Sequence, residues 1–273
     1  MKLSMWSSYY VDLSPEDAIL ELAKWGIHYT ELSDEHGEVL LKRGNPAEVG
    51  KAFGEFARQN GVEVLQGHLW LRVALCTDTE NTVKVLCDWL DMFHAMGIKN
   101  AVLHCDRVRN NPDLSPEDRV EENVKVLKRL TSHIEGRDIN IALENLTAPG
   151  LCSSAEEIIR IIEKVGGNKL SICLDTGHLH LCEVRDQIHF IRTAGKYLQA
   201  LHLADNDRST DQHLLPFGKG TVDFPGVFKA LKEIGYGGIY NFEVPYERNA
   251  PLEIRGYKLE YLRKMSEYLE KNA

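Results

Sequence analysis

Short apolar runs alternate with longer amphipathic segments along the whole chain, and this alternation predicts strands separated by helices. Eight runs have the character of strands, namely residues 2–6, 29–32, 62–68, 100–104, 139–144, 170–175, 198–203 and 239–243. The run at 29–32 is the weakest of them. Helices are predicted at about residues 14–25, 79–96, 153–165, 184–194, 224–234 and 254–269, with two more that begin near residues 45 and 115.

Two of the predicted helices begin with the same capping signature. Ser14-Pro15 and Ser115-Pro116 each place a serine at the N-cap, a proline in the first turn and two acidic residues after it. Residues 33–43 are predicted to form a polar loop.

Eight successive strand and helix units predict an α/β protein, a single (β/α)8 TIM barrel that spans residues 1–273 as one domain. Such a barrel typically needs about 250 residues, and no proline-rich or low-complexity linker interrupts the chain. An open Rossmann sheet would be expected to carry a glycine-rich loop after its first strand. Residues 7–10 are Ser-Ser-Tyr-Tyr instead, which counts against that alternative.

Charge and composition limit the expected partners. The formal net charge is −9, and because nucleic-acid binding normally needs a basic face, we expect no nucleic acid partner. No apolar run approaches the ~20 residues that a membrane span requires, so no membrane association is expected. The six cysteines form no Cys-x-x-Cys pair, and no long apolar segment follows the first residues, which favours reduced thiols in a cytoplasmic protein.

Six side chains that can bind metals stand where apolar runs give way to loops. They are His68, His104, Glu144, Asp175, His202 and Glu243. The carboxyl ends of barrel strands form the face where active sites are built, so these residues are expected to ring the barrel mouth. Taken singly, each has a simpler explanation, such as a buried salt bridge for Glu144, a helix N-cap for Asp175 or a satisfied core position for His202. Their recurrence at consecutive strand ends favours a shared site.

The chemistry of the later strand ends indicates a divalent metal. Because the eighth strand of a closed barrel lies beside the first, Glu243 can face Glu144 with Asp175 and His202 between them. This oxygen-rich set suits Mn²⁺ or Mg²⁺ better than a structural zinc site, with Co²⁺ or Zn²⁺ as alternatives. We expect Mn²⁺.

The segment 204–223 is the longest loop after a predicted strand, and it offers further candidates. Asp211-Gln212-His213 can place two donors on one side of an extended segment, so Asp211 and His213 are candidate additional metal ligands. Lys219 lies between glycines that would let the backbone approach a ligand. Lys219 and Trp70, in the loop after the third strand, are therefore candidate substrate contacts.

Five segments together resemble a known family: ALEN, CLDTGH, LHLADND, DQHLLPFGKGTVDF and NFEV, in this order. They resemble the xylose isomerase-like TIM barrel superfamily, in particular its sugar phosphate isomerase/epimerase branch with ketose 3-epimerases and inosose-acting relatives. The resemblance covers essentially the whole chain, and its second half is the more specific. It implies a metal tetrad of Glu144, Asp175, His202 and Glu243.

The resemblance also implies roles for the neighbouring residues. Glu144 and Glu243 would double as catalytic bases. His178 and Arg208 would bind the substrate, and His68 and His104 would line its pocket. The implied activity is that of a divalent-metal-dependent sugar or cyclitol isomerase or epimerase, which removes a proton next to a carbonyl. We also expect a homo-oligomer, either a dimer or a tetramer.

The chain departs from the ketose 3-epimerases at residues 147–150, Thr-Ala-Pro-Gly, where those enzymes carry a further substrate-binding carboxylate. Inositol derivatives, hydroxypyruvate and oxidised sugars therefore stay open as substrates. A keto-sugar or inosose lyase or dehydratase would begin with the same proton abstraction and then expel a β-substituent.

Two further alternatives belong to other functional classes. AP endonucleases of the same superfamily hold three zinc ions, and their ligands would match His68, His104, Glu144, Asp175, His178, His202, Asp211, His213 and Glu243. The acidic net charge counts against a DNA substrate. A non-catalytic barrel that binds sugars without turnover is the other alternative.

Overall fold

The computed structural model describes residues 1–105, 113–147, 151–182, 186–245, 247 and 249–272. The segment at 147–150, where the sequence departs from the ketose 3-epimerases, therefore lies outside the described residues except for Thr147.

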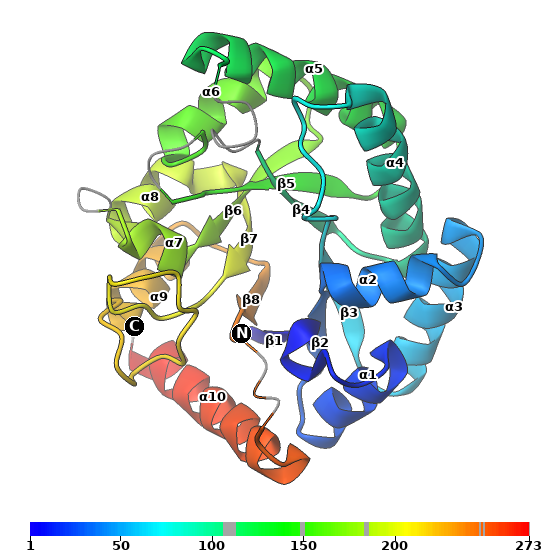
Figure 1. The fold of residues 1–273 in the computed structure, drawn as a ribbon. Helices are drawn as coiled ribbons and strands as arrows, with labels where there is room; N and C mark the ends of the chain where they lie inside the picture. Colours follow the sequence, from blue (N-terminus) through cyan, green and yellow to red (C-terminus); the bar gives the residue numbers. More distant parts are fainter. Residues whose placement is uncertain (106–112, 148–150, 183–185, 246, 248, 273) are drawn as a thin grey trace.

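Eight parallel strands form one sheet at the centre of the molecule (Figure 1). They are β1 (Lys2–Trp6), β2 (Tyr29–Leu32), β3 (Glu63–His68), β4 (Asn100–His104), β5 (Asn140–Glu144), β6 (Leu170–Asp175), β7 (Leu198–His202) and β8 (Ile239–Phe242). From β1 to β7 each strand pairs with its neighbours in sequence, and β1 also pairs with β8. A bridge between Leu203 and Phe242 joins β7 to β8. The sheet therefore curls into a nearly closed barrel, and the predicted (β/α)8 TIM barrel is confirmed.

Helices surround the strands on the outside (Figure 1). They are α1 (Pro15–Lys24), α2 (Asp34–Leu41), α3 (Pro46–Gln59), α4 (Thr79–Met96), α5 (Pro116–His133), α6 (Ala155–Val165), α7 (Thr176–His180), α8 (Gln187–Ala194), α9 (Phe224–Glu233) and α10 (Leu252–Asn272). Both predicted serine caps are confirmed, since Ser14 Oγ accepts from Asp17 N at 3.1 Å and Ser115 Oγ from Asp118 N at 3.1 Å. Among the described helices, none combines the length and apolarity needed to cross a bilayer.

Two short helices were not predicted. Residues 33–43, predicted to be a loop, contain α2, which Ser33 caps by accepting from His36 N at 3.3 Å. Its many acidic and polar residues obscured the helical pattern in the sequence, although one side of the helix is buried and includes His36, Gly37 and Leu40. The single turn of α7 follows β6 directly. The helix predicted at 184–194 begins at Gln187, and residues 183–185 lie outside the described part of the chain.

Candidate metal and active site at the barrel mouth

The last four strands bring a carboxylate and imidazole tetrad to one end of the barrel. Glu144, Asp175 and His202 are the last residues of β5, β6 and β7, and Glu243 follows β8 directly. All four are buried, with exposed fractions of 1%, 0%, 0% and 8%. Each offers one ligand atom that lies within 4.8 Å of the others'. The four residues predicted to bind a metal therefore lie together.

Three atoms of this tetrad are buried and make no hydrogen bond of acceptable geometry: Asp175 Oδ2, His202 Nδ1 and Glu243 Oε2. His202 Nδ1 and Glu243 Oε2 lie only 2.9 Å apart. Buried polar atoms are almost always satisfied, because leaving one without a partner is costly. Two carboxylate oxygens and an imidazole nitrogen that face each other in this way fit a divalent cation.

Three more histidines surround Glu144. His68 Nε2 and His104 Nε2 lie 3.3 Å and 2.9 Å from Glu144 Oε2. His178 Nδ1 lies 3.1 Å from the other oxygen, Glu144 Oε1. His68, His104 and Glu144 form a second group with ligand geometry. The three histidines predicted to contact substrate are therefore all packed against Glu144.

The loop after β7 completes the cluster. It is anchored by a pair of backbone hydrogen bonds between Asp205 and Leu214, each 2.8 Å long. Asp211 lies between two imidazoles, with Oδ2 at 3.3 Å from His178 Nε2 and Oδ1 at 3.1 Å from His213 Nε2. Asp175, His178 and His213 form a further group of potential ligands. The Asp-x-His segment therefore lies at the mouth, as its spacing suggested.

The charges of the cluster are strongly coupled. Burial would raise the pKa of Glu144, but His104 and His202 hold it well below its usual range. Burial likewise opposes the ionisation of Glu243, yet His202 and His213 lower its pKa to about 2. Asp175 behaves differently, since burial raises its pKa to about 6 against the opposing effect of His178.

The pKa values of the histidines depend on the same balance between burial and neighbouring charged groups. Burial lowers the pKa of His104 to about 4, and Glu144 offsets this only in part. Burial would lower the pKa of His68, but Glu144 and, to a smaller extent, Glu31 together raise it to about 9. For His213, Glu243 and Asp211 outweigh burial and raise its pKa to about 10. Protonated histidines are one source of the positive charge that these carboxylates require, and a divalent cation is another.

Three of the expected substrate contacts lie apart from the cluster. Arg208 is exposed, and its Nε donates to the His180 carbonyl at 3.2 Å. Lys219 is also exposed. Trp70 is half-buried, and its ring stacks on Trp89 with the centroids 5.6 Å apart. Their roles in binding remain predictions.

Two residues of the site were not predicted. Glu31 of β2 is fully buried and lies 2.9 Å from His202 Nε2. The thiol of Cys173 on β6 joins Glu144 and His202 in a group with ligand geometry. The one signal for Glu31 was an acidic side chain within the weakest apolar run, next to Thr30 and Leu32.

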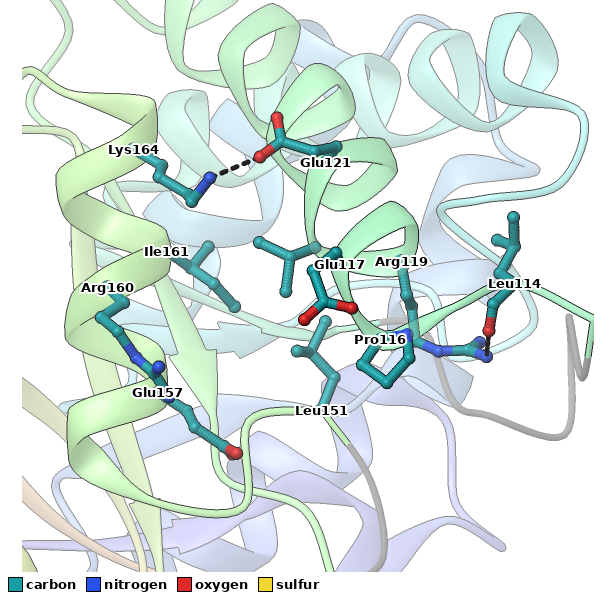
Figure 2. Close-up of a pocket in the computed structure, with 11 residues that line it drawn as sticks. Leu114, Pro116, Glu117, Arg119, Glu121, Leu151, Glu157, Arg160, Ile161 and Lys164 are labelled. Carbon is teal, nitrogen blue, oxygen red and sulfur yellow. Dashed lines mark hydrogen bonds and ion pairs between the residues drawn. The ribbon is translucent and has the colours of Figure 1, made fainter.

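A groove of about 510 Å³ lies elsewhere, on the outer surface between α5 and α6 (Figure 2). Glu121 of α5 and Lys164 of α6 form an ion pair beside it, and Leu151 and Ile161 contribute apolar surface. No candidate site residue is among the described residues that line this groove. It is therefore separate from the barrel-mouth site.

Comparisons with known proteins agree with this geometry. An L-ribulose 3-epimerase of Methylomonas sp. is 25% identical over 251 residues, which are 88% of this chain and 81% of that protein. An uncharacterized protein of Sinorhizobium fredii is 28% identical over 196 residues, 71% of this chain and only 60% of its own length. The structure of a D-psicose 3-epimerase from Clostridium cellulolyticum superposes with a TM-score of 0.83 over 99% of both chains at 18% identity, which shows the shared fold.

A family model decides the assignment, because it matches most of the chain rather than one segment. The model described as "Xylose isomerase-like TIM barrel" matches residues 19–265, from the first helix through the last. The chain belongs to the xylose isomerase-like TIM barrel family.

Proposed function

We propose that the protein is a divalent-metal-dependent isomerase or epimerase that acts on a sugar or cyclitol by moving a proton next to a carbonyl group. One observation carries the proposal: ligand atoms of the four buried tetrad residues lie within 4.8 Å of one another, and three buried atoms, on Asp175, His202 and Glu243, make no hydrogen bond of acceptable geometry. The likeness to a ketose 3-epimerase supports the substrate class.

Glu144, Asp175, His202 and Glu243 would hold the metal. A divalent ion at this position would polarise the oxygens of the substrate and stabilise the negative charge that develops on them. Mn²⁺ is the ion that we propose, because three carboxylates and one imidazole form an oxygen-rich set.

Glu144 and Glu243 would act as the bases, and the neighbouring imidazoles that lower the pKa of both carboxyl groups keep them in the ionised form that can accept a proton. Glu144 ends β5 and Glu243 follows β8, and around the barrel β6 and β7 lie between these two strands, so the glutamates reach the site from different directions. One carboxylate can remove a proton from the carbon next to the carbonyl, and the other, after it has taken up a proton from solvent, can deliver that proton to the intermediate. Delivery to the opposite face of that carbon inverts its configuration. Delivery to the former carbonyl carbon, together with transfer of the adjacent hydroxyl proton to the former carbonyl oxygen, moves the carbonyl.

Solvent exchange tests this proposal directly. Metal-loaded protein is incubated in deuterated water with ketoses, keto-sugars and inososes, and incorporation is followed by mass spectrometry. We expect incorporation into one of these substrates, and Glu144→Gln or Glu243→Gln should reduce it about 10²- to 10⁴-fold, because each removes a group that accepts or donates the proton.

Glu63→Gln is the matched control, because Glu63 is an exposed carboxylate at the start of β3. It should exchange at the rate of the unaltered protein. The absence of exchange with every substrate, or equal exchange in all three variants, would contradict the proposal. A product lighter than the substrate by the mass of the expelled group would identify a lyase or dehydratase instead.

A second candidate, a hydrolase with several metal ions, is favoured by one specific observation. The groups His68–His104–Glu144 and Asp175–His178–His213 adjoin the tetrad and share Glu144 and Asp175 with it. Such a cluster can activate water for phosphodiester cleavage. Elemental analysis separates the two candidates, because an isomerase needs one ion per chain, whereas an AP endonuclease should contain about three zinc ions and should nick abasic duplex DNA.

A further inference from the structure

Glu31 is a buried carboxylate outside the tetrad that contacts a tetrad residue. It lies within β2, one residue before the end of the strand, with no exposed surface, on the opposite side of the His202 imidazole from the other carboxylates. Its two oxygens lie 3.0 Å and 2.9 Å from His202 Nε2. The other ring nitrogen, Nδ1, lies 2.9 Å from Glu243 Oε2 and 3.3 Å from Glu144 Oε2.

We propose that Glu31 is a positioning residue that holds His202 with Nε2 protonated and Nδ1 directed into the tetrad as a metal ligand. The proposal rests on the function proposed above, because it assigns a purpose to Glu31 only if the tetrad binds a metal. Glu31 itself need not touch the metal or the substrate.

The orientation of the imidazole follows from simple hydrogen-bond accounting. A carboxylate only accepts hydrogen bonds, so the nitrogen that faces Glu31 must carry the proton. In a neutral imidazole the proton on Nε2 leaves the lone pair on Nδ1. Nδ1 makes no hydrogen bond of acceptable geometry and lies among the tetrad oxygens, where a bound cation would take its lone pair. Metal-binding histidines commonly donate their second ring N–H to a carboxylate, which sets the tautomer and strengthens the ligand.

The position of Glu31 is itself held by two amide groups. Gln66 Nε2 of β3 donates to Glu31 Oε2 at 2.9 Å, and Asn241 Nδ2 of β8 donates to the same oxygen. The amide of Asn241 is oriented by Ser4, whose hydroxyl donates to Asn241 Oδ1 at 2.8 Å. Both amide groups are fully buried. A carboxylate with this many fixed donors can hold the imidazole within a narrow range of angles, which a water molecule in its place could not.

A purely structural role would also place a buried carboxylate beside a histidine, so the test must follow the metal and the tautomer rather than stability alone. In the Glu31→Gln variant the side chain keeps its shape and loses its charge. We expect its affinity for Mn²⁺, measured by competition with a chromogenic chelator, to fall about 10- to 100-fold. Asp34→Asn is the control, because Asp34 is a nearby carboxylate with only 6% of its surface exposed. Its affinity should change less than about 3-fold.

Two further measurements separate positioning from structure. In the His202→Asn background, Glu31→Gln should have little additional effect on Mn²⁺ affinity, because Glu31 acts through the imidazole. In the unaltered protein loaded with diamagnetic Mg²⁺ or Zn²⁺, long-range ¹H–¹⁵N spectra should show His202 protonated at Nε2, with the resonance assigned from its loss in His202→Asn. This second measurement does not depend on the folding of any Glu31 variant.

The outcomes distinguish this inference from the proposed function. If the unaltered protein binds no divalent metal, the proposed function fails and the inference fails with it. If the unaltered protein binds Mn²⁺ and Glu31→Gln binds it equally well, the function survives and the role of Glu31 is overturned. Protonation of His202 at Nδ1 in the metal-loaded protein would overturn that role in the same way.

Discussion

At the residue scale, Asp175 shows how one side chain can serve the fold and the site at once. Its Oδ1 accepts from His178 N at 2.6 Å and so caps α7, whereas its Oδ2 is buried without a partner. The helix cap that seemed an alternative to metal binding is therefore present together with a free ligand atom. Capping needs one oxygen only, which leaves the second for a cation.

The raised pKa of Asp175 predicts an effect of pH on stability. Burial raises the pKa of Asp175 in the folded protein to about 6. The folded state therefore keeps its proton over a pH range in which the unfolded chain has lost it, and stability falls as pH rises from about 4 to about 6. Asp175→Asn keeps an oxygen for the helix cap and removes this ionisation. We expect it to stabilise the metal-free protein by ~2 kcal/mol at about pH 8 and to have little effect at about pH 4.

Thermal unfolding with chelator present at the two pH values measures this difference. Asp186→Asn is the matched control, because Asp186 also caps a helix, α8, but is exposed. It should show no gain that depends on pH. A loss of stability in Asp175→Asn at about pH 8 would contradict the burial argument. The variant should also lose metal affinity, as expected for a metal-binding residue that lowers the stability of the metal-free protein.

The site residues differ in how far the sequence could predict them. Glu144, Asp175 and His202 could be found because each ends a long apolar run, and strand ends of a barrel converge whatever the details of packing. Glu31 could not, because it lies inside a four-residue strand and acts on His202, 171 positions away. Its importance depends on which barrel-facing side chains meet, and periodicity alone does not give that information.

At the element scale, the contact between α3 and α4 depends on two glycines. A Cβ at Gly50 would lie 2.1 Å from the Met92 carbonyl oxygen, and one at Gly54 would lie 2.4 Å from the Met96 carbonyl oxygen. The Met96 carbonyl also accepts from Arg58 Nη1 at 3.0 Å, so it is not free to move away. Glycine in these two positions lets the helix backbones approach closely.

Gly54→Ala should therefore destabilise the protein, although the same change usually stabilises an exposed helix by about 1 kcal/mol. The added methyl group meets backbone rather than a flexible side chain, and overpacking of this kind costs about 1 to 3 kcal/mol. We expect the free energy of unfolding to fall by ~2 kcal/mol in urea titrations. Lys51→Ala, on the exposed side of the same helix, should change it by less than about 0.5 kcal/mol. A more stable Gly54→Ala variant would show that the helices can separate without penalty.

The elements themselves were largely predictable because short apolar runs alternate with amphipathic segments along the chain. Two of the helices also share a capping signature. A serine cap, a proline and an acidic pair mark the beginnings of α1 and α5. By contrast, α2 could not be predicted, because a glycine and several charged residues dilute its apolar side. That helix is stable through its packing: Gly37 lies so close to Trp89 that a Cβ there would be 2.3 Å from the ring. Tertiary contact thus overrides a weak local preference.

At the scale of the whole molecule, the proposed metal tetrad lies across the join of the barrel with the least backbone pairing among the described strands. Between β7 and β8 the described pairing is the bridge at Leu203 and Phe242, with Leu203 N donating to Asn241 O at 2.8 Å and Glu243 N donating to Leu203 O at 3.1 Å. His202 and Glu243 stand on the two sides of this join. A metal ion bound by residues of both strands would link the strands where backbone pairing is sparse.

Metal binding should therefore protect the β7–β8 join more than the rest of the barrel. We expect hydrogen exchange at the Leu203 and Glu243 amides to slow by up to about 100-fold when Mg²⁺ or Zn²⁺ is present at about 100 times its Kd, because local opening then requires release of the ion. The Ile141 amide, which donates to Lys169 O at 2.9 Å near the start of β5, should change much less. The His202→Gln variant should show no slowing at the join. Equal slowing at all three amides would mean that the ion stabilises the protein as a whole, and no slowing at Leu203 would mean that β7 and β8 do not share it.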